Sequence, residues 1–114
     1  MTSASLIGIN GREIALDKDG YLIDLADWDE HVATSLAFQN DITLVAAHWE
    51  IINLLRNFYN RHQMSPPNRA LVNLVKRDLG VDKGKSIYLM KLFGGSLAKT
   101  ASKISGLPKP ENCL

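Results

Sequence analysis

The spacing of apolar residues changes along this chain, and that change restricts the fold more than any other feature of the sequence. Residues 4–23 contain short apolar runs separated by Asn10-Gly11 and by Asp17-Lys18-Asp19-Gly20, which are typical of tight turns. After Asp24 the apolar residues recur about every 3.6 positions, as on one face of a helix. The sequence therefore predicts a small antiparallel β meander over residues 1–24, followed by helices.

Prolines and glycines divide the rest of the chain into five predicted helices. Their expected ranges are 27–39, 45–62, 66–79, 83–92 and 97–105. Asp27 is the expected N-terminal cap of the first helix, with Glu30 three residues later completing a capping box. Six aromatic residues recur at helical spacing and are expected to pack in the core rather than to stack on nucleic-acid bases: Trp28, Trp49, Phe58, Tyr59, Tyr88 and Phe93.

The length and composition fit a single α+β domain that spans residues 1–114. The chain has 114 residues, of which 46% are hydrophobic and 22% are charged, so it has enough apolar side chains for one core. The β meander is expected to pack on the helical array of residues 25–105. Residues 106–114 contain two prolines and no helical pattern, which predicts a flexible, extended C-terminal arm.

The residue content excludes several kinds of site. The sequence has one cysteine, so neither an internal disulfide nor a multi-cysteine metal centre can form within the chain. His31, His48 and His62 are too far apart in sequence to share a helical turn, so we expect no metal site. We also find no phosphate-binding loop, signal peptide or apolar run long enough to span a membrane. A cytoplasmic protein without metal or cofactor is expected.

Charge is distributed unevenly along the chain. Residues 1–41 contain two basic and eight acidic residues, whereas residues 83–114 contain six lysines and one acidic residue, Glu111. Spread lysines are often only a solvated surface, but a cationic C-terminal third could also contact nucleic acid or an acidic partner.

Cys113 is the candidate reactive residue, because it lies on the proline-containing arm with only Leu114 after it. A lone cysteine usually packs as a small apolar residue. A thiol on an extended arm is poorly placed for packing but can reach into the active site of another protein. A free thiol has a pKa of about 8.5, and Lys103 and Lys109 favour its ionisation whereas Glu111 opposes it. The sequence therefore favours a sulfur carrier over a self-contained catalyst.

Several runs of residues resemble the DsrC/TusE family. They are Gly106-Leu107-Pro108-Lys109-Pro110 followed by Cys113, the run 83–89, and the upstream segments His48-Trp49-Glu50 and Phe58-Tyr59. The resemblance covers nearly the whole chain. It implies a small β meander packed on an array of helices with a mobile C-terminal arm.

The resemblance is to the TusE branch of this family. The DsrC branch, which works with dissimilatory sulfite reductase, has a second arm cysteine where this chain has Ser102, and we expect Ser102 to be an exposed helix residue without a role. The TusE branch implies a sulfur-relay protein, a sulfurtransferase whose last cysteine, here Cys113, takes up sulfur as a persulfide. It further implies a TusBCD-like complex as donor and an MnmA-like tRNA thiolase, acting with tRNA on 2-thiouridine, as acceptor.

Two other functions stay open at this point. The chain could be an accessory or gamma-type subunit of a sulfite-reductase-like complex. It could also be a regulator that binds nucleic acid through the two short helices of residues 67–93, which fit a helix-turn-helix. The second of these helices offers Lys83, Lys85 and Lys91 but no arginine or glutamine for bidentate contacts with bases, which weakens the regulator hypothesis.

Overall fold

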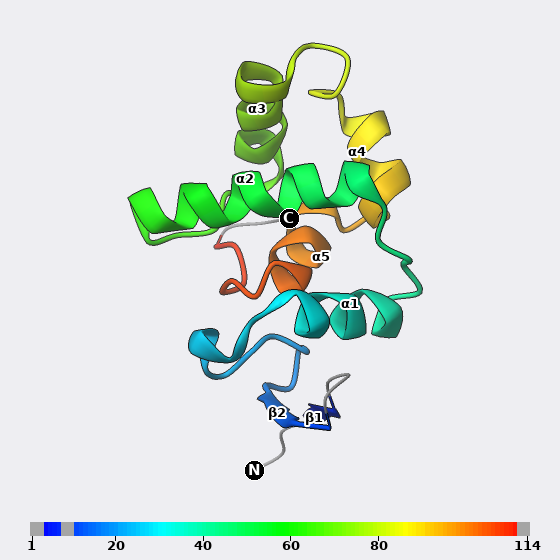
Figure 1. Ribbon diagram of the computed structural model, residues 1–114. Coiled ribbons are helices and arrows are strands. Elements are labelled where there is room, and N and C mark those ends of the chain that lie inside the picture. Colours follow the sequence, from blue (N-terminus) through cyan, green and yellow to red (C-terminus); the bar gives the residue numbers. More distant parts are fainter. Residues whose placement is uncertain (1–3, 8–10, 112–114) are drawn as a thin grey trace.

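The computed structural model describes residues 4–7 and 11–111, and it places a small β hairpin at one end of an array of helices (Figure 1). In chain order the described elements are β1 (Ala4–Ile7), β2 (Glu13–Leu16), a short 3-10 helix (Leu25–Asp27), α1 (Glu30–Gln39), α2 (Ala46–His62), α3 (Asn68–Leu79), α4 (Ser86–Phe93) and α5 (Leu97–Ile104). The predicted order of strands followed by five α-helices is confirmed. None of the helices described is long and apolar enough to cross a membrane.

The predicted β meander is reduced to one hairpin and a single bridge. Residues 4–7 pair antiparallel with residues 13–16. Side chains alternate along β2, so that Ile14 and Leu16 are buried while their neighbours are exposed. The expected third strand forms only one bridge, between Leu16 and Leu22.

The second of the two predicted turns is held by an aspartate. Asp17 accepts hydrogen bonds through its carboxylate from the backbone N–H groups of Asp19, at 2.8 Å, and Tyr21, at 3.0 Å. Short polar side chains commonly stabilise turns in this way. In the first predicted turn, Asn10 lies outside the described residues.

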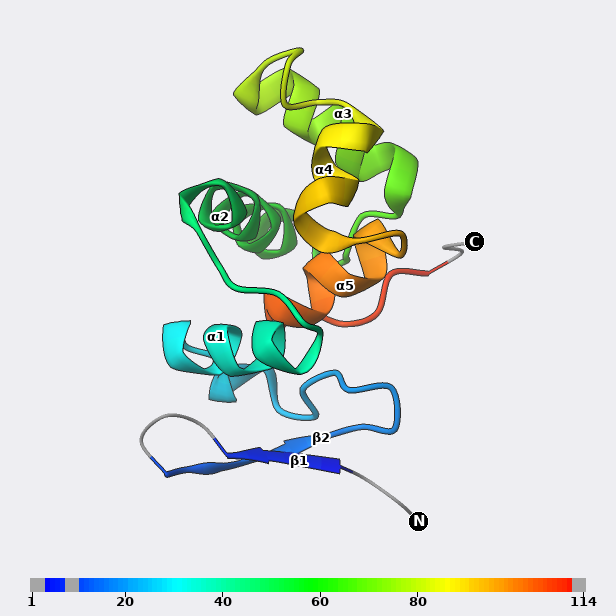
Figure 2. The ribbon, with the colours of Figure 1, turned by 90° about the vertical axis from the view of Figure 1, so that its right-hand side faces the viewer.

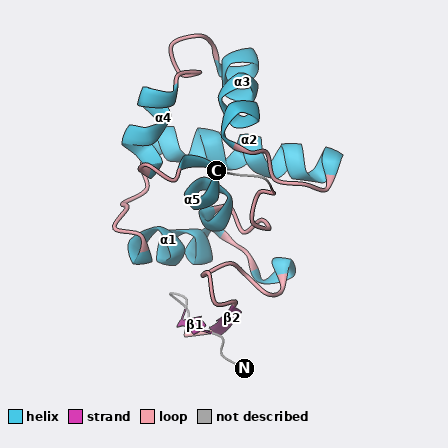
Figure 3. Cartoon of the chain, turned by 180° about the vertical axis from the view of Figure 1, so that it is seen from behind, coloured by secondary structure: helices cyan, strands magenta, loops and turns pink. Residues whose placement is uncertain are grey.

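Helix α5 is the centre of the helical array. It packs against α1, α2, α3 and α4. Figures 1 and 2 both show it above α1, while α3 and α4 lie at the end of the molecule away from the hairpin, as they also do from behind in Figure 3. Ala98, Ala101 and Ile104 of α5 are fully buried. The small alanine side chains let the surrounding helices approach α5 closely.

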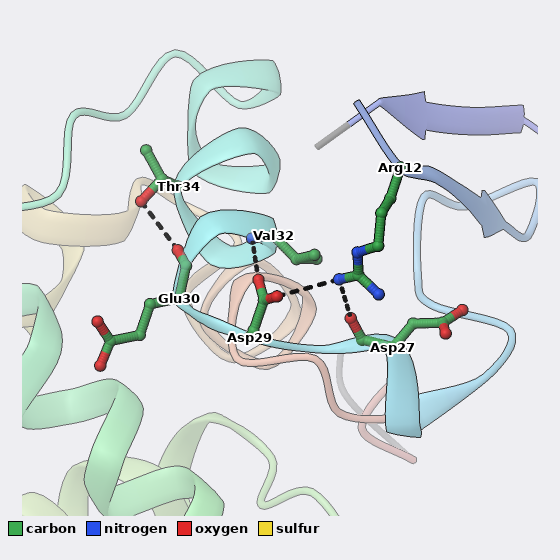
Figure 4. Close-up of polar contacts among 6 residues, drawn as sticks. All are labelled: Arg12, Asp27, Asp29, Glu30, Val32 and Thr34. Atoms are coloured by element: carbon green, nitrogen blue, oxygen red, sulfur yellow. Dashed lines mark hydrogen bonds and ion pairs between the residues drawn. The ribbon is translucent and has the colours of Figure 1, made fainter. Parts of the chain in front are cut away.

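Asp29, not Asp27, caps α1, which corrects the predicted start of this helix (Figure 4). The Asp29 carboxylate accepts a hydrogen bond of 2.8 Å from the backbone N–H of Val32. Its other oxygen lies 3.0 Å from the Arg12 guanidinium, which also donates to the Asp27 carbonyl at 3.2 Å. Asp27 ends the short 3-10 helix instead, because Trp28 has an extended backbone and directs its indole toward α5.

Helix α4 also starts later than predicted, at Ser86 rather than Lys83. The reason lies at Gly84, where the chain crosses α3 so closely that a Cβ would stand 2.3 Å from the Cα of Lys76. The chain therefore turns against α3 before the helix begins. The predicted boundaries of the helices that became α2, α3 and α5 agree with the structure to within about two residues.

The core contains most of the aromatic residues that were expected there. Phe93 is buried in it, and four others pack against it while partly buried: Trp28, Trp49, Tyr59 and Tyr88. Phe58 differs, because it lines a surface hollow between α2 and α3 with its ring centroid 4.5 Å from that of His62. On α4, Ile87 is exposed although it is apolar.

Candidate functional site

The segment that leads to the predicted reactive cysteine starts at a tight turn after α5. Leu107 donates its backbone N–H to the carbonyl of Ser102 at 3.0 Å, and Gly106 donates to the next carbonyl of the helix at 3.1 Å. This pair of bonds is a Schellman motif, which needs a left-handed residue, and Gly106 has a φ of +74°. A Cβ on Gly106 would lie 2.2 Å from the Trp28 ring, so a residue without a side chain is required there.

Trp28 and Arg56 bind the last carbonyl groups of α5. The indole Nε1–H of Trp28 donates to the Ile104 carbonyl at 2.9 Å, and the Arg56 guanidinium donates to the Ser105 carbonyl at 2.7 Å. The guanidinium also lies over the Trp28 ring, 3.8 Å from its centroid. Burial lowers the pKa of Arg56, but arginine stays charged at neutral pH, and a cation is favoured at a helix C-terminus. These contacts fix the point at which the chain leaves α5.

The first part of the predicted arm is packed on the folded body. Leu107 and Pro110 are buried. The Ser65 hydroxyl, from the loop after α2, donates a hydrogen bond of 2.6 Å to the Pro108 carbonyl. The prediction of an arm over the whole of residues 106–114 is therefore corrected: its first residues are anchored by apolar burial and by this hydrogen bond.

Cys113, the predicted reactive residue, lies outside the described residues, so its role stays a prediction. Cys113 follows Glu111 by two residues in sequence. Residues 106–111 are called the anchored segment below, and Glu111 is exposed at its end. The surface around Glu111 is therefore the part of the described structure that is nearest in sequence to Cys113.

A hollow of about 350 Å³ opens beside Glu111. It is lined by the end of α2, the loop that follows it and the anchored segment, including His62, Met64, Ser65, Pro108, Lys109 and Glu111. Lys109 and Glu111 were identified from the sequence as groups that act on the thiol. His62 was missed, because it is brought here by α2 and no local sequence pattern signals it. Lys103, the other predicted neighbour, lines a different hollow.

Ser102 is fully buried, so the expectation that it is an exposed helix residue is wrong. The residue lies on α5 at the face that the other helices cover. Its hydroxyl has no hydrogen-bond partner among the described residues, and the same is true of the Ser105 hydroxyl. Most buried polar groups in proteins are hydrogen-bonded, so both serines are unusual.

The three histidines lie in separate places. His48 is buried; its Nδ1 accepts from the backbone N–H of Val45 at 3.0 Å, and its Nε2 lies 2.8 Å from the Leu92 carbonyl, to which it donates. This histidine therefore ties the start of α2 to the end of α4. His31 and His62 are exposed. Across the described residues, no group of three histidine, cysteine, aspartate or glutamate residues could hold a metal ion.

Comparison with known sequences gives matches over nearly the full length of the chain. The family model described as DsrC like protein matches residues 8–114. The sulfurtransferase TusE homolog of Haemophilus influenzae is 46% identical over 109 residues, which is 96% of this chain and 100% of the relative. Sulfurtransferase TusE of Photorhabdus laumondii is 44% identical over 109 residues, covering 96% of this chain and 98% of the relative.

Comparison with solved structures gives the same fold. The NMR structure of Allochromatium vinosum DsrC matches with a TM-score of 0.88 and 41% identity, covering 99% of this chain and 100% of the other. The crystal structure of the oxidized gamma-subunit of dissimilatory sulfite reductase (DsrC) from Archaeoglobus fulgidus matches with a TM-score of 0.82 and 37% identity, covering 97% and 100%. The predicted α+β fold is thereby confirmed.

Proposed function

The chain belongs to the DsrC-like family, and we propose that it acts there as a sulfur-relay sulfurtransferase whose sulfur-carrying residue is Cys113. The observation that carries the proposal is the similarity, over nearly the whole chain, to relatives named sulfurtransferase TusE at 42% to 47% identity. The anchored segment supports it. The Schellman turn, the Ser65 hydrogen bond and the burial of Pro110 hold the chain up to three residues before Cys113.

The proposed reaction consists of two displacements at sulfur. The Cys113 thiolate attacks the outer sulfur of a donor persulfide, the S–S bond of the donor breaks, and the donor cysteine leaves as a thiolate. Cys113 then carries the persulfide. An acceptor thiolate attacks the outer sulfur in turn, and Cys113 is released as a thiolate. No external oxidant or reductant is needed, because each step exchanges one S–S bond for another.

The charges near the anchored segment match a carrier. Lys109 favours the thiolate form of Cys113, whereas Glu111 opposes it. The two effects offset each other, so the free protein holds its thiol without strong activation. A relay protein benefits from this balance, because its thiol should react when a partner supplies further activating groups and not with every electrophile it meets.

The sequence contains no second cysteine, and this separates the chain from a carrier that closes an internal disulfide. The position where a second arm cysteine was expected for the DsrC branch holds Ser102, whose hydroxyl is buried. Sulfur bound to Cys113 therefore leaves only by transfer to another molecule. This favours the TusE type of relay.

The donor and acceptor are proposed from the same relationship. We propose that a TusBCD-like complex supplies the sulfur and that an MnmA-like tRNA thiolase, bound to tRNA, receives it for 2-thiouridine synthesis in the cytoplasm. The relatives' names support a sulfur-relay protein that works with other sulfur-transfer proteins. Omission of this protein from a reconstituted thiolation reaction should slow 2-thiouridine formation, and an unchanged rate would contradict the proposed destination.

The two alternative functions have less support. The solved structures of DsrC, including a sulfite reductase gamma-subunit, share the fold, but the relatives that are 46% and 47% identical to this chain are named as sulfurtransferases. For a nucleic-acid regulator, the predicted recognition helix offers only Lys83, Lys85 and Lys91 as cations, and Lys83 also donates to Glu50 at 2.8 Å, which competes with a phosphate contact.

Sulfur loading of Cys113 can be tested by mass spectrometry of the intact protein. After incubation with glutathione persulfide, the wild type should gain the mass of one sulfur atom, and Cys113→Ser should gain none. Asn112→Ser is the matched control, since it introduces the same residue next to an intact cysteine, and it should load like the wild type. Undiminished loading of Cys113→Ser would overturn the assignment.

A further inference from the structure

A second hollow, of about 340 Å³, shares Lys109 with the hollow beside Glu111, and we call it the basic hollow. Its walls come from four parts of the chain: the start and body of α5 with Ser96, Lys99, Thr100 and Lys103, the turn after β2 with Asp19 and Tyr21, the end of α1 with Asn40, and the anchored segment with Lys109. Three lysines and one aspartate therefore face the same space. The proposed transfer chemistry uses neither Lys99 nor Lys103.

Tyr21 contacts the backbone of one of these lysines and the side chain of the other. Its hydroxyl donates a hydrogen bond of 3.0 Å to the backbone carbonyl of Lys99. Its ring lies under the Lys103 ammonium, whose nitrogen is 5.2 Å from the ring centroid. Tyr21 itself is only 3% exposed, and the Asp17 carboxylate fixes its backbone. Tyr21 therefore fixes the α5 backbone at Lys99 and offers its ring face to the Lys103 ammonium.

The positive charge of the basic hollow is incompletely neutralised. Asp19 lies 3.6 Å from the Lys109 ammonium, but about half of each side chain is exposed, and such surface pairs are weak. Lys99 and Lys103 have no ion pair among the described residues, unlike Lys83, which pairs with Glu50. An anionic ligand that binds in the hollow would thus meet Lys99 and Lys103, neither of which pairs with a carboxylate of the described residues.

The basic hollow includes a residue of the segment that leads to the predicted sulfur carrier. Lys109 precedes Cys113 by four residues in sequence. A partner seated on the hollow would therefore have the thiol within reach. Docking of the partner on the hollow would therefore help to position the partner's sulfur atom for reaction with the Cys113 thiol.

We propose that the basic hollow docks a partner protein that presents a cluster of carboxylate side chains beside its own sulfur-bearing cysteine. This inference rests on the proposed function, since sulfur that passes between cysteines requires a protein partner. The hollow also offers little to a nucleic-acid strand. Its one aromatic residue, Tyr21, is buried, so no ring is free for base stacking, and none of its cations is an arginine.

The test measures binding in the absence of the sulfur chemistry. The full-length Cys113→Ser protein, labelled with ¹⁵N, is titrated at low ionic strength with hexaglutamate and, separately, with a hexathymidylate strand. Amide shift changes with hexaglutamate should be concentrated at residues that line the basic hollow, including Lys99, Thr100 and Lys103. Lys99→Glu/Lys103→Glu in the same background should weaken the affinity by at least about tenfold, because it replaces attraction by repulsion.

The matched control is Lys85→Glu/Lys91→Glu, which makes the same change of charge on exposed lysines of the α4 region. This variant should keep the hexaglutamate shifts at the hollow. Equal losses in the two double variants would show nonspecific attraction and overturn the proposal, as would tighter binding of hexathymidylate than of hexaglutamate at the hollow. Because every protein in this test carries Cys113→Ser, a negative binding result would contradict the docking proposal alone. The sulfur-loading experiment tests the proposed function separately.

Discussion

The indole nitrogen Nε1 of Trp28 lies 2.9 Å from the carbonyl oxygen of Ile104, although 76 residues separate the two in sequence. The bond joins the segment before α1 to the last turn of α5. From α2, Arg56 adds a guanidinium that lies over the Trp28 ring and binds the next carbonyl of α5. Three distant parts of the chain therefore meet where the anchored segment begins.

Replacing Trp28 by phenylalanine should destabilise the protein by about 1–2 kcal/mol, because it leaves the Ile104 carbonyl without its donor in a partly buried place. Urea unfolding followed by circular dichroism measures this. Trp49→Phe is the matched control, since Trp49 is also partly buried against the core and makes no side-chain hydrogen bond within the described structure. Equal losses in the two variants would mean that ring size, and not the hydrogen bond, matters.

Gly106→Ala should cost about 3 kcal/mol of unfolding free energy, from a strained left-handed backbone together with overlap with the Trp28 ring. Gly11 provides the comparison. It also has a positive φ, of +79°, but a Cβ there would meet nothing within 4 Å. Gly11→Ala should therefore cost only about 1 kcal/mol. Similar losses measured by urea unfolding would contradict the close approach of Gly106 to Trp28.

Ser65→Ala and Ser102→Ala should have opposite effects, although both remove one buried hydroxyl. Ser65 loses its hydrogen bond to the Pro108 carbonyl, so the variant should be destabilised by about 1 kcal/mol. The Ser102 hydroxyl is buried without a partner in the described structure, so its removal should be neutral or stabilising by up to about 1 kcal/mol. Thermal unfolding of Ser65→Ala and Ser102→Ala, each compared with the wild type, measures both effects. A clear loss of stability in Ser102→Ala would show that the Ser102 hydroxyl is hydrogen-bonded.

The sequence was a good guide to the helices and a poor guide to how they meet. The helical spacing of apolar residues is confirmed on α3, where Leu71, Leu74 and Val75 are all buried. Such patterns are local, since residues three and four apart lie on one face of a helix. The cap of α1 was misplaced because two aspartates stood close together, and the contact of Trp28 with α5 decided between them.

Long-range relationships account for the parts of the site that the sequence did not reveal. The approach of His62 to the hollow beside Glu111 and the burial of Ser102 both depend on how the helices pack. The motif around Gly106 was recognised in the sequence, but its physical reason was not, because the Trp28 ring that excludes a side chain lies far away in sequence. Cys113 was identified by type and position, and its role stays a prediction.

The reactivity of Cys113 should respond in opposite directions to Lys109→Gln and Glu111→Gln. A positive charge stabilises the thiolate, so loss of Lys109 raises the pKa of the thiol and slows alkylation, whereas loss of the Glu111 carboxylate lowers that pKa and speeds it. At a separation near 10 Å in water, one charge is worth about 0.4 kcal/mol, or about a twofold change in rate. Iodoacetamide alkylation at neutral pH and low salt, followed by mass spectrometry, gives the rates.

Two controls separate this effect from a change of structure. Lys91→Gln removes an equal charge from an exposed position on α4 and controls for the change in net charge; it should alter the alkylation rate less than Lys109→Gln does, because Lys109 is only four residues from the thiol in sequence. The differences at Lys109 and Glu111 should also shrink in molar salt, where the screening length falls to about 3 Å. A change of the alkylation rate in the same direction in Lys109→Gln and Glu111→Gln would exclude a direct electrostatic action on the thiol. So would differences from the wild type that stay equally large in high salt.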